Sequence, residues 1–492
     1  MNIKQAKEEL KHTIRAYLQK DVYGNYKMDT IRQRPVLLMG PPGIGKTAIM
    51  EQVSKECEIG LVSYTITHHT RQSAIGLPFI EKKVYGGREY SITEYTMSEI
   101  IAAVYDRMEA TGCEEGILFI DEINCVSETL APTMLQFLQC KTFGNHKVPK
   151  GWIIVAAGNP PEYNKSVRDF DIVTLDRVKK IDVTEDYGIW KEYAYERLIH
   201  PAILSYLDIK KEDFYRIETT IDGKEFVTAR GWEDLSQMMK LYEELEYEIT
   251  EEVIIQYLQH KRVARDFANY LDLYQKYQNQ YKIEEILQGK IVQSTVQTLS
   301  KAAFDEKISM ISLLITKLAA GIKDALEQDA FTNELYAKLK EVQAEQSVAV
   351  VLNRIQVKME QMKEREMLDP QQELSMNRLI AVLEAYEPVM EEAGFDGVKG
   401  EFSKEVALRK KMLETMKLQL EYAFLFLEQA FVEGQELVWF VTELTANYYT
   451  AKYIGRFGCE KYFYYNKELL LVEKDQQLQQ EIDEIKGLLE FM

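Results

Sequence analysis

A glycine-rich loop between an apolar run and a helix-forming segment constrains the fold of this chain most. The apolar run Val36–Met39 precedes the loop, helix-forming residues follow from Ala48, and the loop itself reads Gly40-Pro41-Pro42-Gly43-Ile44-Gly45-Lys46-Thr47. This G-x-x-x-x-G-K-[ST] pattern indicates a phosphate-binding loop, because backbone amides and a helix N-terminus can converge on phosphate oxygens there. We expect Lys46 to contact the β- and γ-phosphates of a nucleotide, and the Thr47 hydroxyl to bind Mg²⁺.

Two further apolar runs end in polar residues, as strands of a parallel sheet do beside a ligand. Ile117–Ile120 leads into Asp121 and Glu122, and Asn159 closely follows Trp152–Ala157. Because ligands of open α/β sheets bind at the carboxyl ends of the strands, we expect these three polar residues to meet there. Asp121 would hold Mg²⁺ directly or through water, and Glu122 would orient and polarise the water that attacks the γ-phosphate. An ordinary turn at Asn159 is the alternative interpretation.

Three arginines are candidates for two roles that would complete this site. Arg177 could act as an arginine finger that reaches the γ-phosphate bound by a neighbouring subunit, and Arg168 is the second candidate for this role. The role needs a guanidinium group, which is planar and always charged. Arg230 could contact the phosphates from a helical lid. For each arginine, an ordinary surface charge is the alternative.

These motifs, taken in order, resemble an AAA+ ATPase of the MoxR type, in the branch that includes midasin-like and dynein-related domains. The resemblance covers roughly the first half of the chain. It implies that the loop and Ala48 bind ATP as the Walker A motif, and that Asp121 and Glu122 form the Walker B motif. It also implies that Asn159 is sensor 1, that Arg177 is the arginine finger and that Arg230 is sensor 2. The chain has Ala229 where the family often has proline, and Val178 where it often has phenylalanine; both departures affect the arginine assignments. The matching segments are Gly40–Thr47, Phe119–Asn124, Ala157–Pro160, Leu175–Arg177 and Arg230.

An alternating segment between the loop and the Walker B strand predicts an inserted hairpin. After a strand predicted over Ile59–Ile66, the residues Val84–Ile92 alternate around Gly86-Gly87, which is the signal of a tight turn. A hairpin near residues 75–95 resembles the helix-2 insertion of the family, and that resemblance implies contact with a protein client. His68 and His69 have no accompanying Cys/His pattern, so we expect no structural metal.

Composition limits the classes of partner. The net charge of −19 disfavours general nucleic-acid binding, which needs a basic face. The five cysteines show no paired spacing, the N-terminal segment has no apolar signal core, and no apolar stretch is long enough to span a bilayer. We therefore expect a cytoplasmic protein without membrane insertion.

Proline distribution divides the chain. All prolines except Pro370 and Pro388 lie at or before Pro201, so we expect an α/β ATPase core over 1–200, a helical lid over 201–271 and an α-helical region over 272–492. Two short heptad-like seams, at Val348–Met362 and Leu478–Met492, fit either coiled coils or an ordinary helical bundle.

Two further features of the helical region give predictions. Gly394–Gly400 is predicted to be a loop between helices. The tyrosine-rich segment Tyr448–Tyr465 is predicted to be core or a protein interface, with a base-stacking surface as the alternative.

The resulting hypothesis is an ATP-hydrolysing remodelling motor that works as a ring, by resemblance a hexamer, on a protein client. The resemblance also implies a partner with a von Willebrand factor A domain. Two other classes remain open: a nucleic-acid-directed AAA+ motor of a restriction or defence system, and a scaffold that ATP only orders. Glu122 disfavours the scaffold, because a non-hydrolysing protein needs no residue to polarise water.

Overall fold

The fold is an α/β P-loop core with a parallel sheet, followed by a largely helical C-terminal region, as the sequence predicts. The computed structural model describes residues 1–68, 74–163, 170–220, 223–364, 368, 370–431 and 434–467. The chain forms two compact units, which are described separately below. The first comprises Met1–Ile189, Thr228–Arg230 and Val357–Glu373, and the second comprises Trp190–Val227, Gly231–Gln356 and Leu374–Met492.

A five-stranded parallel sheet forms the centre of the first unit, with the strand order β2-β5-β8-β1-β9. Its central strands are buried along their whole length, which explains why they are continuous apolar runs rather than alternating ones. The registers place Leu38 beside Ala157 on one side and Ile181 on the other. The strands are β1 (Val36–Met39), β2 (Gly60–Thr65), β5 (Gly116–Asp121), β8 (Trp152–Gly158) and β9 (Lys179–Asp182).

Helices contribute to an apolar cluster on each face of the sheet. One cluster includes Leu10 and Ile49, and the other includes Ile100 and Phe137, whose ring stacks on Phe143 with the centroids 3.9 Å apart. The helices of this unit that lie before α7 are α1 (Ile3–Tyr17), α2 (Lys46–Glu56), α4 (Glu99–Thr111), α5 (Ala131–Cys140) and the single turn α6 (Ile172–Leu175), with the 3₁₀ turn η1 (Ile66–His68). α2 begins directly at the glycine-rich loop, so the sheet and this helix together fix the position of the loop.

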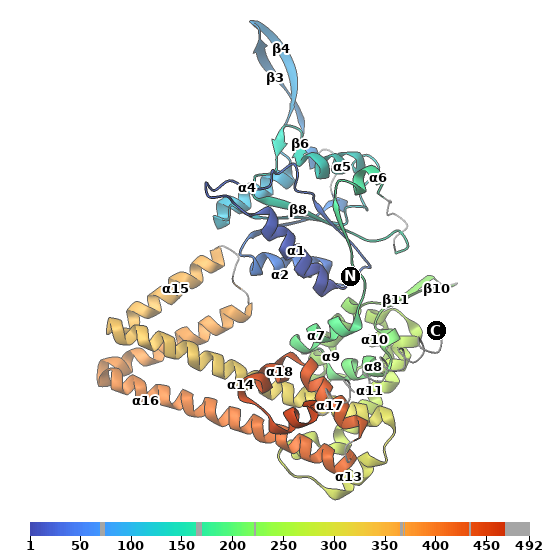
Figure 1. The fold of residues 1–492 in the computed structure, drawn as a ribbon, viewed down its shortest axis with the longest axis vertical. Helices are drawn as coiled ribbons and strands as arrows, with labels where there is room; N and C mark the ends of the chain where they lie inside the picture. The colour runs from blue at the N-terminus through green and yellow to red at the C-terminus, as the bar shows by residue number, and fades with distance from the viewer. Residues whose placement is uncertain are drawn as a thin grey trace, which may run out of the picture. The chain divides into compact units, whose positions relative to one another are not determined.

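The predicted inserted hairpin is confirmed. β3 (Pro78–Tyr85) pairs antiparallel with β4 (Arg88–Tyr95), and the connection is the two-residue turn Gly86-Gly87, with φ of 57° and 79°. Positive φ at both turn residues is the type I′ geometry, which glycine adopts without steric cost. The hairpin projects from the rest of its unit (Figure 1), and several of its apolar side chains are exposed, including Ile80 at 77%. A second small hairpin pairs β6 (Thr142–Phe143) with β7 (His146–Lys147).

The second unit is almost entirely helical. Its aromatic core includes Trp232, Tyr206 and Phe267, with the rings of Trp232 and Phe267 edge to face at 5.3 Å. The elements from the end of the first unit onward are α7 (Tyr187–Glu196), α8 (Pro201–Ile209), η2 (Lys211–Asp213), β10 (Arg216–Thr220), β11 (Gly223–Val227), α9 (Ala229–Glu244), α10 (Glu251–Leu258), α11 (Lys261–Tyr281), α12 (Ile283–Leu287), α13 (Gln293–Ser300), α14 (Phe304–Glu345), α15 (Val348–Glu364), α16 (Pro370–Phe431), α17 (Gln435–Ala446) and α18 (Tyr448–Phe457).

The β10–β11 hairpin was not predicted. It lies within the segment expected to be a purely helical lid, and it places Ile217 beside Phe226 across the pair. β-Branched Thr219 and Thr220 before Asp222-Gly223 are the local signal that could have indicated it.

The predicted glycine-rich loop at Gly394–Gly400 is wrong in extent. Two helical stretches of α16 meet at a kink at Gly394, whose backbone is non-helical with φ 65° and ψ −165°, and the rest of the segment is helical. Val398 is completely buried, and burial of this kind stabilises a helical turn that the glycine content by itself would disfavour.

Helix α15 carries the first predicted heptad-like seam, with Val348 and Ile355 buried. The second seam, Leu478–Met492, lies outside the described residues. In the tyrosine-rich segment, Tyr453 is buried and donates a 2.8 Å hydrogen bond to the Leu413 carbonyl oxygen. None of the helices in the described ranges combines the length and apolar character needed to cross a bilayer.

Candidate nucleotide-binding site

The predicted site residues converge at the carboxyl ends of three adjacent strands. β1 ends at Met39 before the glycine-rich loop, β5 ends at Asp121, and β8 ends at Gly158 before Asn159. Since β8 lies between β1 and β5, the loop, Asp121 and Asn159 are brought to one edge of the sheet. This edge is where open α/β sheets bind ligands.

The glycine-rich loop has the backbone that an anion site requires. Gly45, the N-cap of α2, has a left-handed φ of 93°, and no side chain caps this helix. The first amides of a helix have no intrahelical partner, so the N-terminus of α2 offers donors and the positive end of its dipole to an anion. A Cβ on Gly40 would lie 2.5 Å from the carbonyl oxygen of Val183, so the start of the loop fits glycine only.

Lys46 is held at the centre of the site. Its Nζ donates hydrogen bonds to the carbonyl oxygens of Gly40 at 2.8 Å and Pro41 at 2.7 Å, and to Asn159 Oδ1 at 2.9 Å. Only 8% of the residue is exposed. Burial lowers the pKa of Lys46 to about 8; Asp121 opposes this shift and Arg230 adds to it. A bound polyphosphate would supply the negative charge that this buried ammonium lacks.

Thr47 and Asp121 provide an oxygen pair suited to Mg²⁺. The Thr47 hydroxyl donates to Asp121 Oδ2 at 2.9 Å, and Asp121 Oδ1 accepts the backbone N–H of Glu122 at 2.9 Å. Hydroxyl and carboxylate oxygens are ligands that Mg²⁺ prefers, usually with phosphate oxygens and water completing its shell. The described residues contain no cluster of three or more His, Cys, Asp or Glu side chains suited to a metal ion. The Thr47 hydroxyl and the Asp121 carboxylate fit Mg²⁺ carried on a nucleotide.

Glu122, the predicted water-polarising residue, has an unusual backbone. Its φ is 57°, in the left-handed region that side chains other than glycine rarely occupy. Such a conformation costs on the order of 1 kcal/mol and persists where surrounding structure holds it, often at functional sites. Here the Asp121 carboxylate accepts the Glu122 N–H, which fixes the turn that carries Glu122 away from the strand.

Asn124 is a contributor to this site to which the sequence alone assigned no role. Its Nδ2 donates a 2.7 Å hydrogen bond to the backbone carbonyl of Asn159, and the residue is 3% exposed. The absent side chain of Gly158 makes room for it, because a Cβ there would lie 2.5 Å from Asn124 Oδ1. Its position three residues after Asp121 is visible in the sequence, but its contact across the sheet is not.

The two predicted arginines occupy different places. Arg177 is exposed just after α6, and its Nη1 donates to Gln139 Oε1 on α5. Arg230 lies beside the glycine-rich loop, because a Cβ added to Gly43 would lie 3.5 Å from the Cβ of Arg230. Arg168 and His69 lie outside the described residues. Within the first unit, the structure thus brings Arg230 to the loop, whereas Arg177 contacts a helix of its own chain.

Comparison with known proteins agrees with this geometry. Residues 36–174 match the family model described as ATPase family associated with various cellular activities (AAA). A comparison with curated proteins found no match for the chain. The matched domain indicates an AAA+ ATPase, and such domains bind nucleotide, usually with Mg²⁺, and in general hydrolyse ATP.

Proposed function

We propose that this chain is an ATP-hydrolysing AAA+ motor of the MoxR type, which works as a ring, by resemblance a hexamer, and remodels a protein client. The observation that carries the proposal is the convergence of Lys46, Thr47, Asp121 and Asn159, joined by direct hydrogen bonds at the edge of the sheet. The AAA match supports the ATPase class. The MoxR type rests on the motif resemblance.

The chain's own residues would position the reactants rather than react covalently. When bound, Mg²⁺ would neutralise charge that develops on the phosphates during phosphoryl transfer. Lys46 and the α2 amides would hold the phosphates, and Thr47 and Asp121 would hold the metal. Glu122 would orient and polarise the attacking water, with Asn159 beside it, because hydrolysis needs an aligned nucleophile more than a strong base.

Arg177 is proposed to act on the site of a neighbouring subunit. Its exposed position after α6 supports this role, because an exposed guanidinium is accessible to another copy of the chain. An arginine supplied across an interface stabilises transition-state charge and is worth on the order of 10³–10⁵ in rate. Hydrolysis would therefore stay slow until copies of the chain assemble.

The client is proposed to be a protein, with a von Willebrand factor A domain protein as the expected partner. The exposed apolar side chains of the β3–β4 hairpin support a protein contact, since solvent-exposed Ile80, Val84 and Tyr85 gain by burial against another surface. The net charge of −19 disfavours nucleic acid as the general client.

The experiment that tests the proposal is the ATPase rate per subunit as a function of protein concentration, with mass measured by light scattering in the same samples. We expect the rate to rise as a larger assembly forms, and we expect Glu122→Gln to assemble and bind ATP without turnover. Double-stranded DNA and RNA, added at low and high salt, provide the control for a nucleic-acid-directed motor.

Three outcomes would contradict parts of the proposal. ATP binding with no turnover at any concentration would argue for a nucleotide-ordered scaffold. Turnover by a monomer at full rate would exclude completion of the site by a neighbour. Salt-sensitive stimulation by DNA or RNA would replace the protein client with a nucleic acid.

A further inference from the structure

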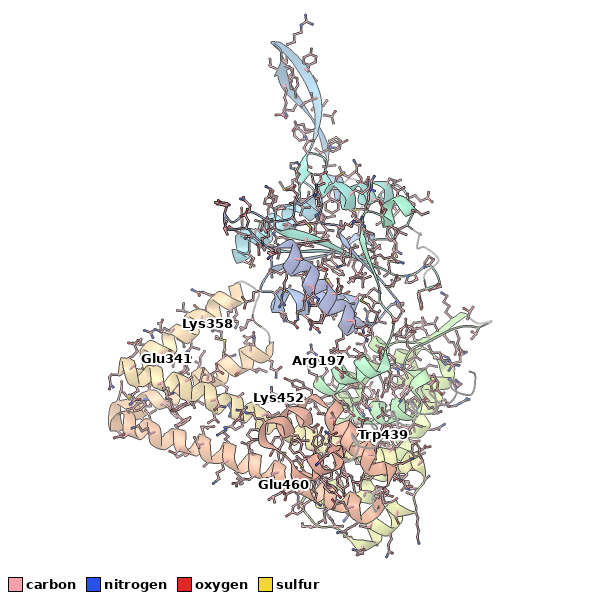
Figure 2. All side chains as sticks on the ribbon, in the orientation of Figure 1. Arg197, Glu341, Lys358, Trp439, Lys452 and Glu460 are labelled. Carbon is pink, nitrogen blue, oxygen red and sulfur yellow. The ribbon has the colours of Figure 1, made fainter. Side chains whose placement is uncertain are left out.

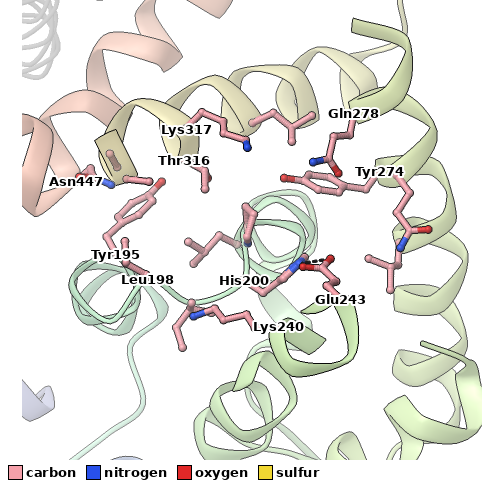
Figure 3. Close-up of a pocket in the computed structure, with 18 residues that line it drawn as sticks. Tyr195, Leu198, His200, Lys240, Glu243, Tyr274, Gln278, Thr316, Lys317 and Asn447 are labelled. Carbon is pink, nitrogen blue, oxygen red and sulfur yellow. Dashed lines mark hydrogen bonds and ion pairs between the residues drawn. The ribbon is translucent and has the colours of Figure 1, made fainter. Parts of the chain in front are cut away.

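A cavity of about 270 Å³ lies within the helical second unit, and all the residues that line it belong to that unit. It is lined by residues of α7, α8, α9, α11 and α14, of the connection between α7 and α8, and of the turn between α17 and α18 (Figure 3). Its wall includes the apolar side chains of Leu198, Ile199, Leu204, Leu271 and Leu313. Apolar side chains combined with convergent polar groups are the composition of a small-molecule site.

Lys240 brings an unpaired positive charge to the wall of this cavity. It lies on α9, is partly buried, and makes no hydrogen bond or ion pair with any residue that the structure describes. The neighbouring carboxylate of Glu243 is already bonded to His200 Nε2 at 3.0 Å. Burial is the main cause that lowers the pKa of Lys240; Lys323 adds to the shift and Glu243 opposes it. An anion placed here would relieve the effects of burial and of Lys323.

Two neutral donors at the wall are also unsatisfied. Tyr274 is 2% exposed, its hydroxyl has no hydrogen-bond partner among the described residues, and it points into the cavity (Figure 3). Asn447 is 1% exposed, and its Nδ2 likewise lacks a partner within the described chain. Its Oδ1 accepts the backbone N–H groups of Tyr449 and Thr450, so the amide orientation is fixed and Nδ2 remains the free donor. Buried donors without partners are rare and destabilising, so a ligand acceptor would satisfy a real deficit.

We propose that this cavity binds a small anion with an apolar body, whose carboxylate or phosphate group lies against Lys240 and accepts from the donors of the wall. The excess of donors selects an anion over a cation, and the leucine and isoleucine side chains select an apolar body over a free inorganic ion. α9 extends from Ala229 to Glu244, so a single helix carries both Arg230 and Lys240. Binding at Lys240 would therefore contact the same helix that presents Arg230.

Binding is tested directly on the full chain, without nucleotide, by isothermal titration calorimetry and saturation-transfer NMR. Hexanoate and hexyl phosphate are the anionic probes, and hexylammonium and 1-hexanol are the probes with equal chain length but no negative charge. We expect saturable binding of one or both anions and none of the other two. Comparison of hexanoate with hexyl phosphate then identifies the preferred anionic group.

Variants separate this site from non-specific binding. Lys240→Met should weaken anion binding about tenfold or more, the loss expected for one partly buried ion pair. The matched control is Lys323→Met, which removes a nearby positive charge outside the cavity wall and should leave binding unchanged. Tyr274→Phe should weaken binding while leaving the melting temperature unchanged or higher, because it removes an unsatisfied buried hydroxyl.

The proposal is overturned if neither anion binds, if hexanol or hexylammonium binds as tightly, or if Lys240→Met leaves affinity unchanged. A fall in melting temperature for Tyr274→Phe would show that the hydroxyl already has a structural partner and would remove it from the site. None of these measurements depends on ATP hydrolysis, so the test of anion binding is independent of the test of the proposed motor function.

Discussion

Asn124 joins the ends of two neighbouring strands through a 2.7 Å hydrogen bond from its Nδ2 to the backbone carbonyl of Asn159. The Asn159 side chain in turn accepts from Lys46 Nζ at 2.9 Å. The turn after β5, the end of β8 and the glycine-rich loop are therefore linked through one continuous set of contacts. This linkage makes Asn124 a positioning residue for the candidate site, although it does not itself reach the predicted phosphate position.

Gly158→Ala should impair hydrolysis through Asn124. The added Cβ would lie 2.5 Å from Asn124 Oδ1, so Asn124 or Asn159 must move. We expect kcat to fall at least about tenfold with ATP affinity nearly unchanged, as expected when a group that acts in the transition state is displaced. Gly455→Ala is the control, because a Cβ at Gly455 meets nothing within 4 Å. A double variant with Asn124→Ser should recover part of the loss; equal losses in single and double variants would exclude the clash as the cause.

Glu122 is expected to lower the folding stability of the protein while being required for ATP turnover. Glu122→Gly removes the cost of a left-handed φ of 57° and should raise stability by about 1 kcal/mol while abolishing turnover. Glu122→Gln should keep the parent stability and ATP binding and lose turnover only. Melting temperature and steady-state ATPase rate, measured on both variants, check this. A lower melting temperature for Glu122→Gly would mean that other contacts of the side chain outweigh the strained backbone.

ATP affinity should weaken as the pH rises through about 8, because Lys46 of the free protein loses its proton there. Bound phosphates favour the charged form and raise this pKa, so the complex holds more protons than the free protein above pH 8. Calorimetry of ATP binding to Glu122→Gln, in buffers of different ionisation enthalpy, should show proton uptake at pH 8.5–9. In Lys46→Arg, whose side chain stays charged, that uptake should disappear. Uptake that persists in this variant would assign it to another group.

Arg177→Ala should lower hydrolysis by on the order of 10³ without preventing assembly, if it acts on a neighbouring site. Mixed with Glu122→Gln, it should regain activity, because some interfaces then combine an intact Glu122 with an intact Arg177. Gln139→Ala removes the partner of Arg177 within the same chain and should have little effect. If no mixture restores turnover, Arg177 is not the finger, and Arg168 becomes the candidate to test.

Lys191 should be critical for the stability of the helical unit. On α7, it donates to Asp208 on α8 and Glu443 on α17, both at 2.6 Å. Its Nζ also lies 5.7 Å from the ring centroid of Trp439, a residue of α17 that is labelled in Figure 2. Lys191→Met leaves two buried carboxylates without their cation and should destabilise the unit by about 3–5 kcal/mol. The more exposed pair Lys210–Asp266 provides the control, since Lys210→Met should cost less than about 1 kcal/mol. Thermal unfolding compares the two; equal shifts would contradict the buried-charge argument.

Local sequence determined those parts of the protein whose structure depends on neighbours in the chain. The glycine-rich loop, the three strands around it and the Gly86-Gly87 turn were predictable, because glycine placement and apolar runs fix backbone conformation over a few residues. The placement of Asp121 and Asn159 at one sheet edge also followed, since parallel strands bring their carboxyl ends together.

Only the tertiary structure decided which distant side chains meet. The hydrogen bond from Asn124 to Asn159, the left-handed Glu122 and the burial of Lys191 between two carboxylates depend on packing between elements far apart in sequence. The same is true where the prediction was wrong in extent: α16 is interrupted only at Gly394, and the burial of Val398 stabilises the helix that follows. The free energy of burial depends on which residues pack together in the folded chain, and the local sequence pattern does not specify those contacts. These features of the site and the helical unit could therefore not be predicted from the sequence alone.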